Sequence, residues 1–394
     1  MEKVTVSPDT EILYQGGQVR GETMHPETPP LYMSTAYIMK DLDELHETNS
    51  SGGYSYNRTS NPNRDCLADV ITSLENGQGT IICSSGMAAI SLALLTYAKQ
   101  GDHILASLSL YGESIDLLDN VISRYGIQTT YVDFTDLEAV RKAVRPNTVL
   151  FYTEVIANPL TTVVNIKELS DIAHQASALV LVDSTFTTPF LIKPIVQGAD
   201  VVIHSLTKYF GGHSDVTAGS ITTATKELLE KVYNIQVLFG CCSDPFAAWL
   251  CLRSVRTMSM RVKQQMSNAE KLAAALQAHP RVLRVNHPSL PGHPQHELAK
   301  NILTNGYGAI MSFSVADDRQ KLNEFMHALR LVKYLPTLGG YRTTLSHPVS
   351  SSHMGVPEEV RLKMGIHEGL MRISVGIEDI DDLIADFTQA LNVF

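Results

Sequence analysis

The chain lacks the features that mark several common classes of protein. Its five cysteines are odd in number and include no Cys-x-x-Cys pair, which argues against a disulfide framework or a zinc site. It also lacks an excess of positive charge, because 31 lysines and arginines stand against 41 aspartates and glutamates, for a net charge of −10. This balance argues against a nucleic acid or an anionic membrane as the main partner.

Long hydrophobic segments are missing as well. The longest nearly apolar run, Met87–Ala98, is much shorter than the roughly 20 residues needed to cross a bilayer. The first residues lack the apolar stretch of a signal peptide. Hydrophobic residues make up 44% of the chain and charged residues 18%, which is typical of an ordered globular protein. We therefore expect a soluble cytoplasmic protein whose cysteines are mostly core thiols.

The common nucleotide and metal motifs are absent too. The chain contains no Gly-x-x-x-x-Gly-Lys-Ser/Thr, no Gly-x-Gly-x-x-Gly after a predicted strand and no His-Glu-x-x-His. We therefore expect neither a P-loop, nor a dinucleotide site of the usual kind, nor a metal site.

The middle of the chain alternates short apolar runs with helical patterns. Helices of about ten residues separate predicted strands at 80–83, 103–106, 129–132, 148–152, 178–182 and 201–204. This alternation predicts an α/β fold with a mostly parallel sheet and helices on both faces. In such sheets ligands bind beyond the carboxyl ends of the strands.

Three regions differ in pattern. The first 60 residues are irregular and rich in Pro, Gly, Ser, Thr and Tyr, which predicts an extended arm over residues 1–60. Residues 61–250 contain the α/β pattern. From Phe246 a long helical region runs to Ala278, with strand-like runs and helices beyond it, so residues 251–394 are predicted to form a smaller C-terminal α+β domain.

Lys208 and Asp183 are the central candidate residues. Lys208 follows an apolar strand and is flanked by Ser205 and Thr207, whereas Asp183 ends the strand at 178–182. In isolation the lysine could be a solvated loop charge and the aspartate a helix cap or turn residue. Together, at the ends of two strands of one sheet, they suggest pyridoxal phosphate. The lysine would hold the aldehyde as a Schiff base, and the carboxylate would keep the pyridine nitrogen protonated.

Two other strand ends add to this interpretation. Ser84–Ala89 joins a strand to a helix, and Gly86 lets the backbone turn closely where the first helical amides can bind a phosphate. Tyr111 follows the next strand, where its ring could stack on a planar cofactor and its hydroxyl act as an acid or base. The alternative is an ordinary half-buried tyrosine.

Candidate substrate-binding residues come later in the chain. Glu154 and Asn158 follow the strand at 148–152, and Asn158 could hydrogen-bond a cofactor hydroxyl or a carboxylate. Arg372 lies in an apolar strand, where a buried guanidinium needs an anion such as a substrate carboxylate. The alternative partner is one of the aspartates at 379–382.

These residues match a known family. The chain resembles, over nearly its whole length, the Cys/Met-metabolism (transsulfuration) group of pyridoxal-phosphate enzymes, which includes cystathionine γ-synthases, cystathionine lyases, methionine γ-lyases and O-acylhomoserine sulfhydrylases. Asp200–Ser214 is similar to the family's lysine signature and departs from it at Leu206. The other matching segments are Tyr56-Asn-Arg58, Asn61-Pro62, Ser85-Gly-Met87, Tyr111-Gly112, Asn158-Pro159, Asp183, Ser346-His-Pro348 and Arg372.

The resemblance implies a fold and a set of residue roles. The fold would be the fold-type I architecture of aminotransferases, assembled as a homotetramer of two catalytic dimers. Lys208 would carry the cofactor, Asp183 would pair with the pyridinium and Tyr111 would stack on the ring. The phosphate would be held by Gly86, Met87, Ser205 and Thr207, and, in the neighbouring subunit's site, by Tyr56 and Arg58. The substrate carboxylate would be bound by Asn158, Thr337 and Arg372.

The resemblance also implies an activity. Lys208 would move protons at Cα and Cβ, and Tyr111 would be the acid for the leaving group or the base for the substrate ammonium. We expect γ-elimination on a γ-substituted L-amino acid of the methionine, homocysteine, cystathionine or canavanine type, releasing a 2-oxo acid and ammonia. The alternative reaction is γ-replacement on an O-acylhomoserine. A non-catalytic protein is disfavoured, because Lys208, Asp183, Tyr111 and Arg372 are all retained.

Two positions depart from the family's pattern. Glu113 follows Tyr-Gly where methionine γ-lyases have a cysteine, and Arg342 stands where cystathionine-handling members commonly have a glutamate. Near the leaving-group end, Glu113 could bind a cationic distal group, such as the guanidine of canavanine or the amine of a diamino acid. The alternative is that Glu113 pairs with Arg342 or faces solvent.

Overall fold

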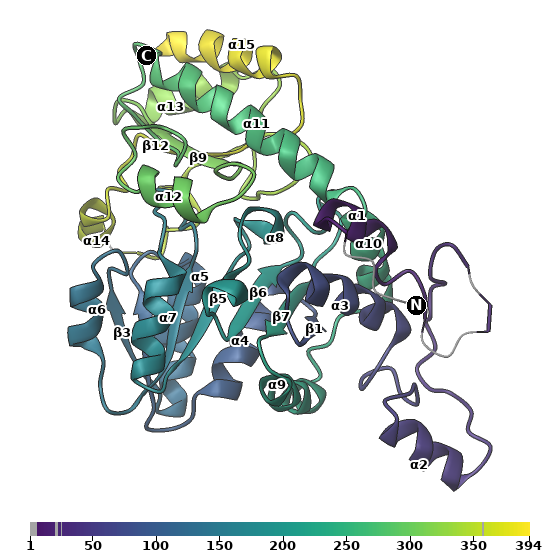
Figure 1. Cartoon of the computed structure of the whole chain (residues 1–394). Coiled ribbons are helices and arrows are strands. Elements are labelled where there is room, and N and C mark those ends of the chain that lie inside the picture. The colour runs from purple at the N-terminus through teal and green to yellow at the C-terminus, as the bar shows by residue number, and fades with distance from the viewer. Residues whose placement is uncertain (1–5, 20–22, 25, 357) are drawn as a thin grey trace.

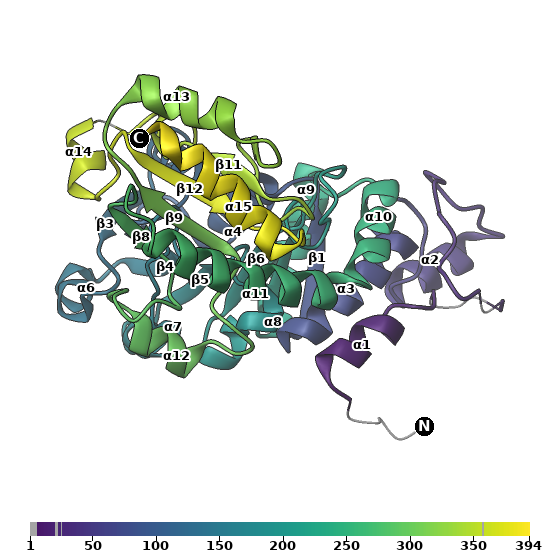
Figure 2. The same ribbon diagram turned by 90° about the horizontal axis from the view of Figure 1, so that it is seen from above.

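Two β-sheets organise the chain, and a long helix runs from one to the other (Figure 1). The structure is a computed structural model that describes residues 6–19, 23–24, 26–356 and 358–394. The larger sheet comes from the first two-thirds of the chain and the smaller sheet from the last third. The N-terminal arm lies to one side, away from the smaller sheet, in both views (Figures 1 and 2).

The larger sheet has seven strands in the order β1-β7-β6-β5-β4-β2-β3. Neighbouring strands are parallel from β3 across to β6, whereas β7 is antiparallel to both β6 and β1. The carboxyl ends of β1, β2, β4, β5 and β6 therefore meet at one edge. The strand bounds are β1 Gly79–Cys83, β2 His103–Ser107, β3 Gln128–Val132, β4 Thr148–Glu154, β5 Leu179–Asp183, β6 Val201–Ser205 and β7 Gly219–Thr223.

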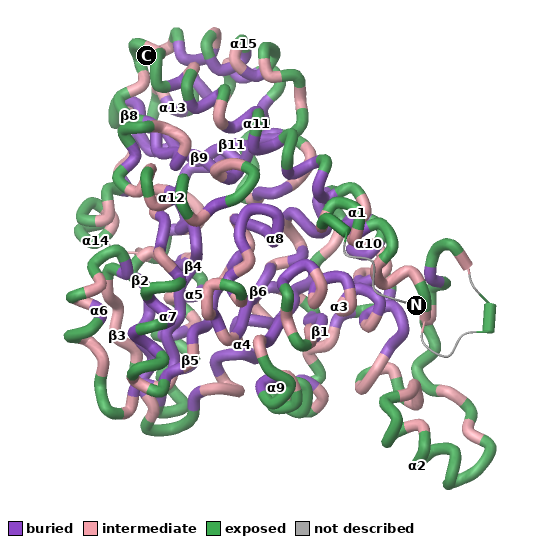
Figure 3. The backbone as a smooth tube through the Cα atoms, viewed as in Figure 1, coloured by how far each residue is buried: buried purple, intermediate pink, exposed green. Residues whose placement is uncertain are grey.

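Helices cover both faces of this sheet, because alternate strand residues point to opposite sides. On one face, Tyr152 and its neighbours pack against α4 (Gly86–Tyr97), α5 (Gly112–Asn120) and α9 (Lys226–Phe239). On the other face, Phe151 and its neighbours pack against α3 (Pro62–Glu75), α6 (Leu137–Ala143), α7 (Ile166–Gln175) and α8 (Thr188–Leu191). Figure 3 shows the strands buried between these two layers.

The smaller sheet has five strands in the order β10-β11-β12-β9-β8. Its core is formed with helices α11 (Met258–Gln277), α13 (Arg319–Ala328) and α15 (Ile380–Ala390), and the rings of Phe313, Phe325 and Phe387 meet within it. The strand bounds are β8 Arg284–Asn286, β9 Ile310–Ser314, β10 Lys333–Tyr334, β11 Thr344–Ser346 and β12 Leu370–Ser374; helices α12 (His296–Ile302) and α14 (Glu358–Lys363) lie in the connections.

The structure differs from the predicted elements at three places. The helical region from Phe246 to Ala278 is two helices, α10 (Pro245–Val255) and α11, separated by a turn at Arg256 and Thr257. The side chain of Arg256 donates there to the carbonyls of Ile12 and Gln15. The arm is less irregular than predicted, since it contains α1 (Pro8–Tyr14) and α2 (Leu42–Ser50). Strand β7 was not predicted.

The predicted fold class is confirmed: it is an α/β protein with a mostly parallel sheet and a smaller C-terminal α+β part. The domain boundaries at residues 60 and 250 stay a prediction. Within the described part of the chain, no disulfide joins any of the five cysteines, and Cys66, Cys83 and Cys251 are buried. None of the helices described there is long and apolar enough to cross a membrane.

Candidate active site

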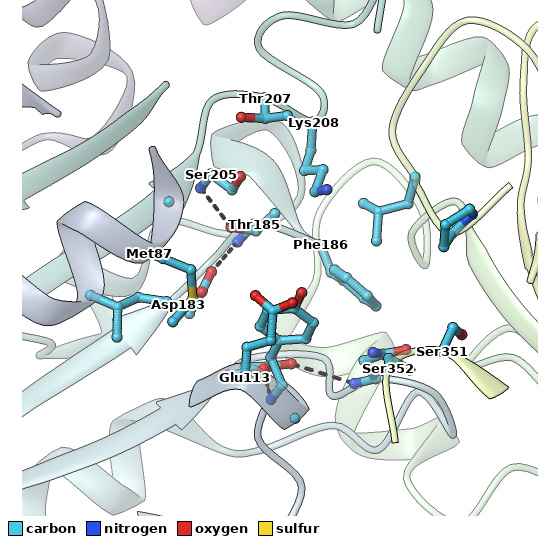
Figure 4. Close-up of a pocket in the computed structure, with 18 of the residues that line it drawn as sticks. Met87, Glu113, Asp183, Thr185, Phe186, Ser205, Thr207, Lys208, Ser351 and Ser352 are labelled. Carbon is cyan, nitrogen blue, oxygen red and sulfur yellow. Dashed lines mark hydrogen bonds between the residues drawn. The ribbon is translucent and has the colours of Figure 1, made fainter. Parts of the chain in front are cut away.

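A cavity of about 660 Å³ opens at the carboxyl ends of the strands, between the larger sheet and the C-terminal part of the chain. Loops after β1, β2, β4, β5 and β6 line it, together with β12. Figure 4 shows Lys208 and Glu113 entering this cavity from opposite sides. The lining includes most of the residues selected from the sequence: Gly86, Met87, Tyr111, Glu113, Asn158, Asp183, Ser205, Thr207, Lys208 and Arg372.

Lys208 lies in the turn after β6, largely shielded from water. Burial lowers the pKa of its amine, the charge of Arg372 adds to this effect, and Glu113 and Asp183 oppose it. Gly339, from the C-terminal part, has φ +73° and packs so closely that a Cβ there would lie 3.1 Å from the Lys208 Cβ. The lysine is therefore fixed between two parts of the chain with an amine that loses its proton more readily than a surface lysine does.

The carboxylates of Asp183 and Glu154 lie side by side, because the two residues are register partners on β5 and β4. Glu154 is buried and Asp183 is partly buried. Burial raises both pKa values, and at Glu154 the charge of Asp183 raises the pKa further, to well above its usual range. At Asp183, hydrogen bonds from Thr185 and the Coulombic effects of His204 and Lys208 oppose the rise. The pKa of Glu154 is raised the more strongly, so Asp183 is favoured as the charged member of the pair.

The loop after β1 forms a close-packed cradle. Ser85 caps α4 by accepting from the Ala88 amide at 3.0 Å, which leaves the amides of Gly86 and Met87 without intrahelical acceptors. A Cβ at Gly86 would lie 2.8 Å from the Cβ of Ser205, and one at Gly219 would lie 2.2 Å from the carbonyl oxygen of Ser85. Only glycines allow these three backbone segments to meet. The helix end they expose is suited to an anion.

Tyr111 is oriented by two carboxyl groups. Its backbone amide donates to Oε1 of Glu154 at 2.7 Å, and its hydroxyl is hydrogen-bonded to Glu113. Burial, followed by the charge of Glu113, raises the pKa of Tyr111 to about 12. The phenol is therefore protonated near neutral pH and can donate a proton.

Arg372 lies on β12 and is buried. Its Nη1 donates to Oδ1 of Asn158 at 3.2 Å and its Nη2 to the carbonyl of Thr337 at 3.1 Å. Its Nε is buried and has no partner among the described residues, and burial lowers the pKa of the guanidinium to about 10. The hydrogen bonds described for it do not go to the aspartates at 379–382, so the structural ion pair considered from the sequence is not formed. The guanidinium still has a donor available for an anion from the cavity.

Comparison with known proteins identifies the family to which the chain belongs. The family model described as "Cys/Met metabolism PLP-dependent enzyme" matches residues 9–392. The chain belongs to this family.

Several relatives share almost the full length of the chain. A cystathionine gamma-lyase of Bacillus subtilis is 38% identical over 96% of this chain and 98% of its own. A canavanine gamma-lyase of Pseudomonas canavaninivorans is 37% identical over 97% and 95%. A cystathionine gamma synthase structure from Xanthomonas oryzae pv. oryzae, in complex with aminoacrylate and cysteine, superposes with a TM-score of 0.94 at 32% identity, covering 99% of each chain. The chain is therefore an enzyme of the transsulfuration family that depends on pyridoxal phosphate.

The residues of the site fit this cofactor. The cradle at Gly86 would hold the phosphate, with Met87, Ser205 and Thr207 beside it. Asp183 would meet the pyridine nitrogen, and Lys208 is positioned to attach the aldehyde. Among the described residues, no group of three or more His, Cys, Asp or Glu side chains could hold a metal ion.

Three predicted residues lie outside the lining of this cavity. Arg58 donates to the carbonyl of Val237, and its guanidinium lies 5.6 Å from the ring centre of Tyr56, on the arm. Thr337 contributes its carbonyl to Arg372 rather than a side chain to the cavity. The predicted roles of Tyr56 and Arg58 concern a neighbouring subunit and stay predictions, as does substrate binding by Thr337.

Some residues of the site had no role assigned from the sequence. Glu154 joins Tyr111 to Asp183, Asp116 lines the cavity from α5, and the segment 351–356 lines its opening. For Thr185 the sequence did offer a signal, because an aspartate side chain such as that of Asp183 commonly accepts from the backbone amide two residues later. The others resemble ordinary surface or strand-end residues in the sequence.

Proposed function

We propose that this enzyme is a lyase that performs γ-elimination on a γ-substituted L-amino acid and releases a 2-oxo acid and ammonia. One observation carries the proposal. A single cavity holds a lysine with a lowered pKa, a protonated tyrosine hydroxyl and a buried arginine with an available donor. These are the groups needed to accept a proton, donate one and hold a carboxylate.

Each of these residues has a distinct part in the reaction. Arg372 and Asn158 hold the α-carboxylate of the substrate and so present its Cα to Lys208. When bound, pyridoxal phosphate supplies an electron sink for the electron pair left at Cα. The amine of Lys208 takes the proton from Cα, passes that proton to the electron sink and, neutral again, takes one from Cβ. The hydroxyl of Tyr111 donates a proton to the atom that leaves Cγ.

The alternative is γ-replacement on an O-acylhomoserine, as in cystathionine γ-synthases. A specific observation keeps it open, because one of the 32% identical relatives of known structure is such a synthase. Both reactions use the same proton transfers and differ in whether water or a nucleophile completes the reaction. The relatives include lyases of cystathionine and canavanine, which are candidate substrate types here.

We also propose a homotetramer of catalytic dimers in which Tyr56 and Arg58 contact the cofactor phosphate of the neighbouring subunit. The arm that holds them is exposed in the single chain, and so are Leu238 and Phe239 at the end of α9, close to the Arg58 contact. Sedimentation of the purified enzyme tests the assembly. A monomer with full activity would overturn it.

The decisive experiment is product analysis on the purified, cofactor-loaded enzyme. The substrates are methionine, homocysteine, cystathionine, canavanine, cysteine and an O-acylhomoserine, the last with and without cysteine. Release of 2-oxobutyrate and ammonia supports γ-elimination. Cystathionine formed from the acylhomoserine and cysteine, with little oxo acid, would replace the lyase proposal with the synthase.

A further inference from the structure

Three polar side chains are buried along one face of α11, the long helix that runs between the two sheets (Figure 1). They are Arg261, Gln265 and Asn268, which are four and three residues apart and so lie one above the other along the helix. Arg261 is 6% exposed, and the other two are fully buried. All three donate to backbone carbonyls that lie outside α11. This face therefore connects the helix to other segments of the chain.

Arg261 holds the turn that carries Lys208. Its Nη1 donates to the carbonyl of Tyr209 at 3.0 Å, and its Nη2 donates to the carbonyl of Ser254 at 3.1 Å. The guanidinium also lies against Gly212, where a Cβ would be 2.1 Å from Nη1. The amide of Gly212 donates to the carbonyl of Lys208 at 2.6 Å and so closes the same turn. Arg261 therefore contacts the residue that follows the lysine and the residue that closes its turn.

Gln265 holds the loop that packs on the lysine from the C-terminal part of the chain. Its Nε2 donates to the carbonyl of Gly340 at 2.7 Å. The preceding residue, Gly339, packs on Lys208, and its amide donates to Oγ of Ser374 on β12 at 2.9 Å. One side chain of α11 thus fixes a loop that lies between the lysine turn and β12.

Asn268 holds the end of the strand that carries Arg372. Its Nδ2 donates to the carbonyl of Gly376 at 3.1 Å and to that of Glu378 at 2.8 Å, two and four residues after β12 ends. The same face of α11 therefore contacts the segments that carry both basic groups of the cavity, Lys208 and Arg372.

One atom of this face indicates that the polar residues do not serve stability alone. Oε1 of Gln265 is buried and has no hydrogen-bond partner in the described part of the chain. An unpaired buried carbonyl group destabilises a fold, whereas a methionine side chain of similar length would leave no such group. The amide is better explained by the bond that its other end donates to Gly340.

We propose that Arg261, Gln265 and Asn268 are positioning residues that set the separation of Lys208 and Arg372. These two groups come from different sheets, so strand register does not fix one relative to the other. The inference rests on their proposed roles in attaching the cofactor and in holding the α-carboxylate, and applies to elimination and replacement alike. A displacement of about 1 Å between reacting groups can lower a rate by up to about 100-fold.

The test uses two reagents that react with the aldehyde of the bound cofactor through the same aminooxy group. Aminooxyacetate has a carboxylate that Arg372 can hold, whereas methoxyamine has none. Loss of the absorption of the bound cofactor gives both rates without turnover of a substrate. Each rate is divided by the rate with free pyridoxal phosphate, which corrects for intrinsic reactivity. The ratio of the corrected rates measures how well a carboxylate on Arg372 is aligned with the aldehyde at Lys208.

The variants remove single hydrogen bonds and leave both basic groups in place. Gln265→Met and Asn268→Leu cannot donate to their carbonyls, and each should lower the ratio about 10-fold while the methoxyamine rate changes little. Gln389→Met is the matched control. Gln389 donates to the carbonyl of Ala328 at the same distance of 2.7 Å, but it joins only α13 and α15.

Two further measurements distinguish positioning from a general loss of structure. With an amino acid substrate, both variants should lower kcat about 10-fold with little change in KM, because Arg372 still binds the carboxylate. Arg261→Lys retains a donor for the carbonyl of Tyr209 and Arg261→Met does not, so the ratio should fall less in the lysine variant. Thermal unfolding of each variant identifies the temperatures at which it is folded, and the rates are compared there.

The outcomes separate the positioning role from the proposed function. A wild-type preference for aminooxyacetate that falls in the α11 variants and persists in Gln389→Met supports the inference. A preference that every variant retains would overturn it and leave the roles of Lys208 and Arg372 unchanged. Equal corrected rates in the wild-type enzyme would overturn it together with carboxylate binding by Arg372. A preference that falls as expected in an enzyme that releases no 2-oxo acid would support the positioning role and remove the proposed lyase function.

Discussion

The inner end and the opening of the active-site cavity are built differently. The inner end consists of residues at strand ends or within a strand, fixed by backbone register and close glycine contacts: Asp183, Lys208 and Arg372. The opening consists of the first turns of α5 and the segment 351–356, where charged side chains are exposed. The residues that act on the part common to all substrates are therefore fixed by the backbone of the sheet. The residues that contact the variable side chain of a substrate lie on exposed helix and loop surface, where substitution is better tolerated.

The largest effect should come from the inner end. Lys208→Ala removes the group that attaches the cofactor and moves the protons, so activity should fall by about 10³-fold or more on every substrate alike. Steady-state assays and the absorption of bound cofactor measure this. Lys231→Ala, which breaks an exposed ion pair on α9, is the control. If the variant lost activity on one substrate and kept it on another, the proposed division of roles between the inner end and the opening would be contradicted.

Tyr111 lies between the inner end and the opening, so a substitution there shows with which of the two it acts. Tyr111→Phe removes the proton donor, and we expect kcat to fall about 10²-fold with little change in KM. Tyr125→Phe, at an exposed tyrosine, is the matched control. If the loss were confined to substrates with a cationic distal group, Tyr111 would belong functionally with Glu113 at the opening.

Gly86 should affect cofactor binding rather than substrate choice. Gly86→Ala places a Cβ against Ser205 and should weaken cofactor affinity about 10-fold, because the two segments of the cradle must separate. Gly292→Ala is the control, since nothing lies within 4 Å of a Cβ at that position. Cofactor dissociation followed by absorbance should differ between the two variants. Equal cofactor affinities of the two variants would show that the backbone at Gly86 moves to accept the extra methyl group without a loss of binding free energy.

The smallest expected effect is electrostatic: the charge of Glu113 at the opening changes the pKa of Lys208 at the inner end. The neutral amine of Lys208 is the form that attacks the cofactor aldehyde, so the rate of reconstitution of cofactor-free enzyme should rise with pH through the lysine's lowered pKa. The charge of Glu113 raises that pKa, so Glu113→Gln should shift the midpoint to lower pH. Glu138→Gln, which changes an exposed glutamate of α6, should not shift it. A midpoint that moves upward would contradict the sign of the interaction.

Sequence reasoning found the inner end well because its residues follow strands that a simple pattern reveals. Lys208 and Asp183 were predicted from their place after apolar runs, and the structure brings both into one cavity. Strand β7 was missed because Gly-Ser-Ile-Thr-Thr contains one large apolar residue. The break between α10 and α11 was missed because no glycine or proline marks it in the sequence.

The opening was harder to predict for a physical reason. Asp116 is an ordinary charged residue on a helix surface in the sequence, and its place in the cavity wall depends on the packing of Ser352 and Gly355 against α5. The segment 351–356 has no pattern of helix or strand that would mark it. Glu113 was noticed only because of its neighbour Tyr111, and the absence of a pair with Arg342 required the structure.

The cradle also determines when during synthesis the protein can first retain its cofactor. Its parts are separated by more than a hundred residues, because Gly86 contacts Ser205 and Ser85 contacts Gly219. A growing chain on the ribosome therefore lacks its own part of the phosphate site until β7 has been made and lies between β1 and β6. Strand β7 pairs antiparallel with both β1 and β6 and so joins the two strands whose loops form the cradle. Binding of the cofactor phosphate in this cradle therefore requires that β1, β7 and β6 are already paired.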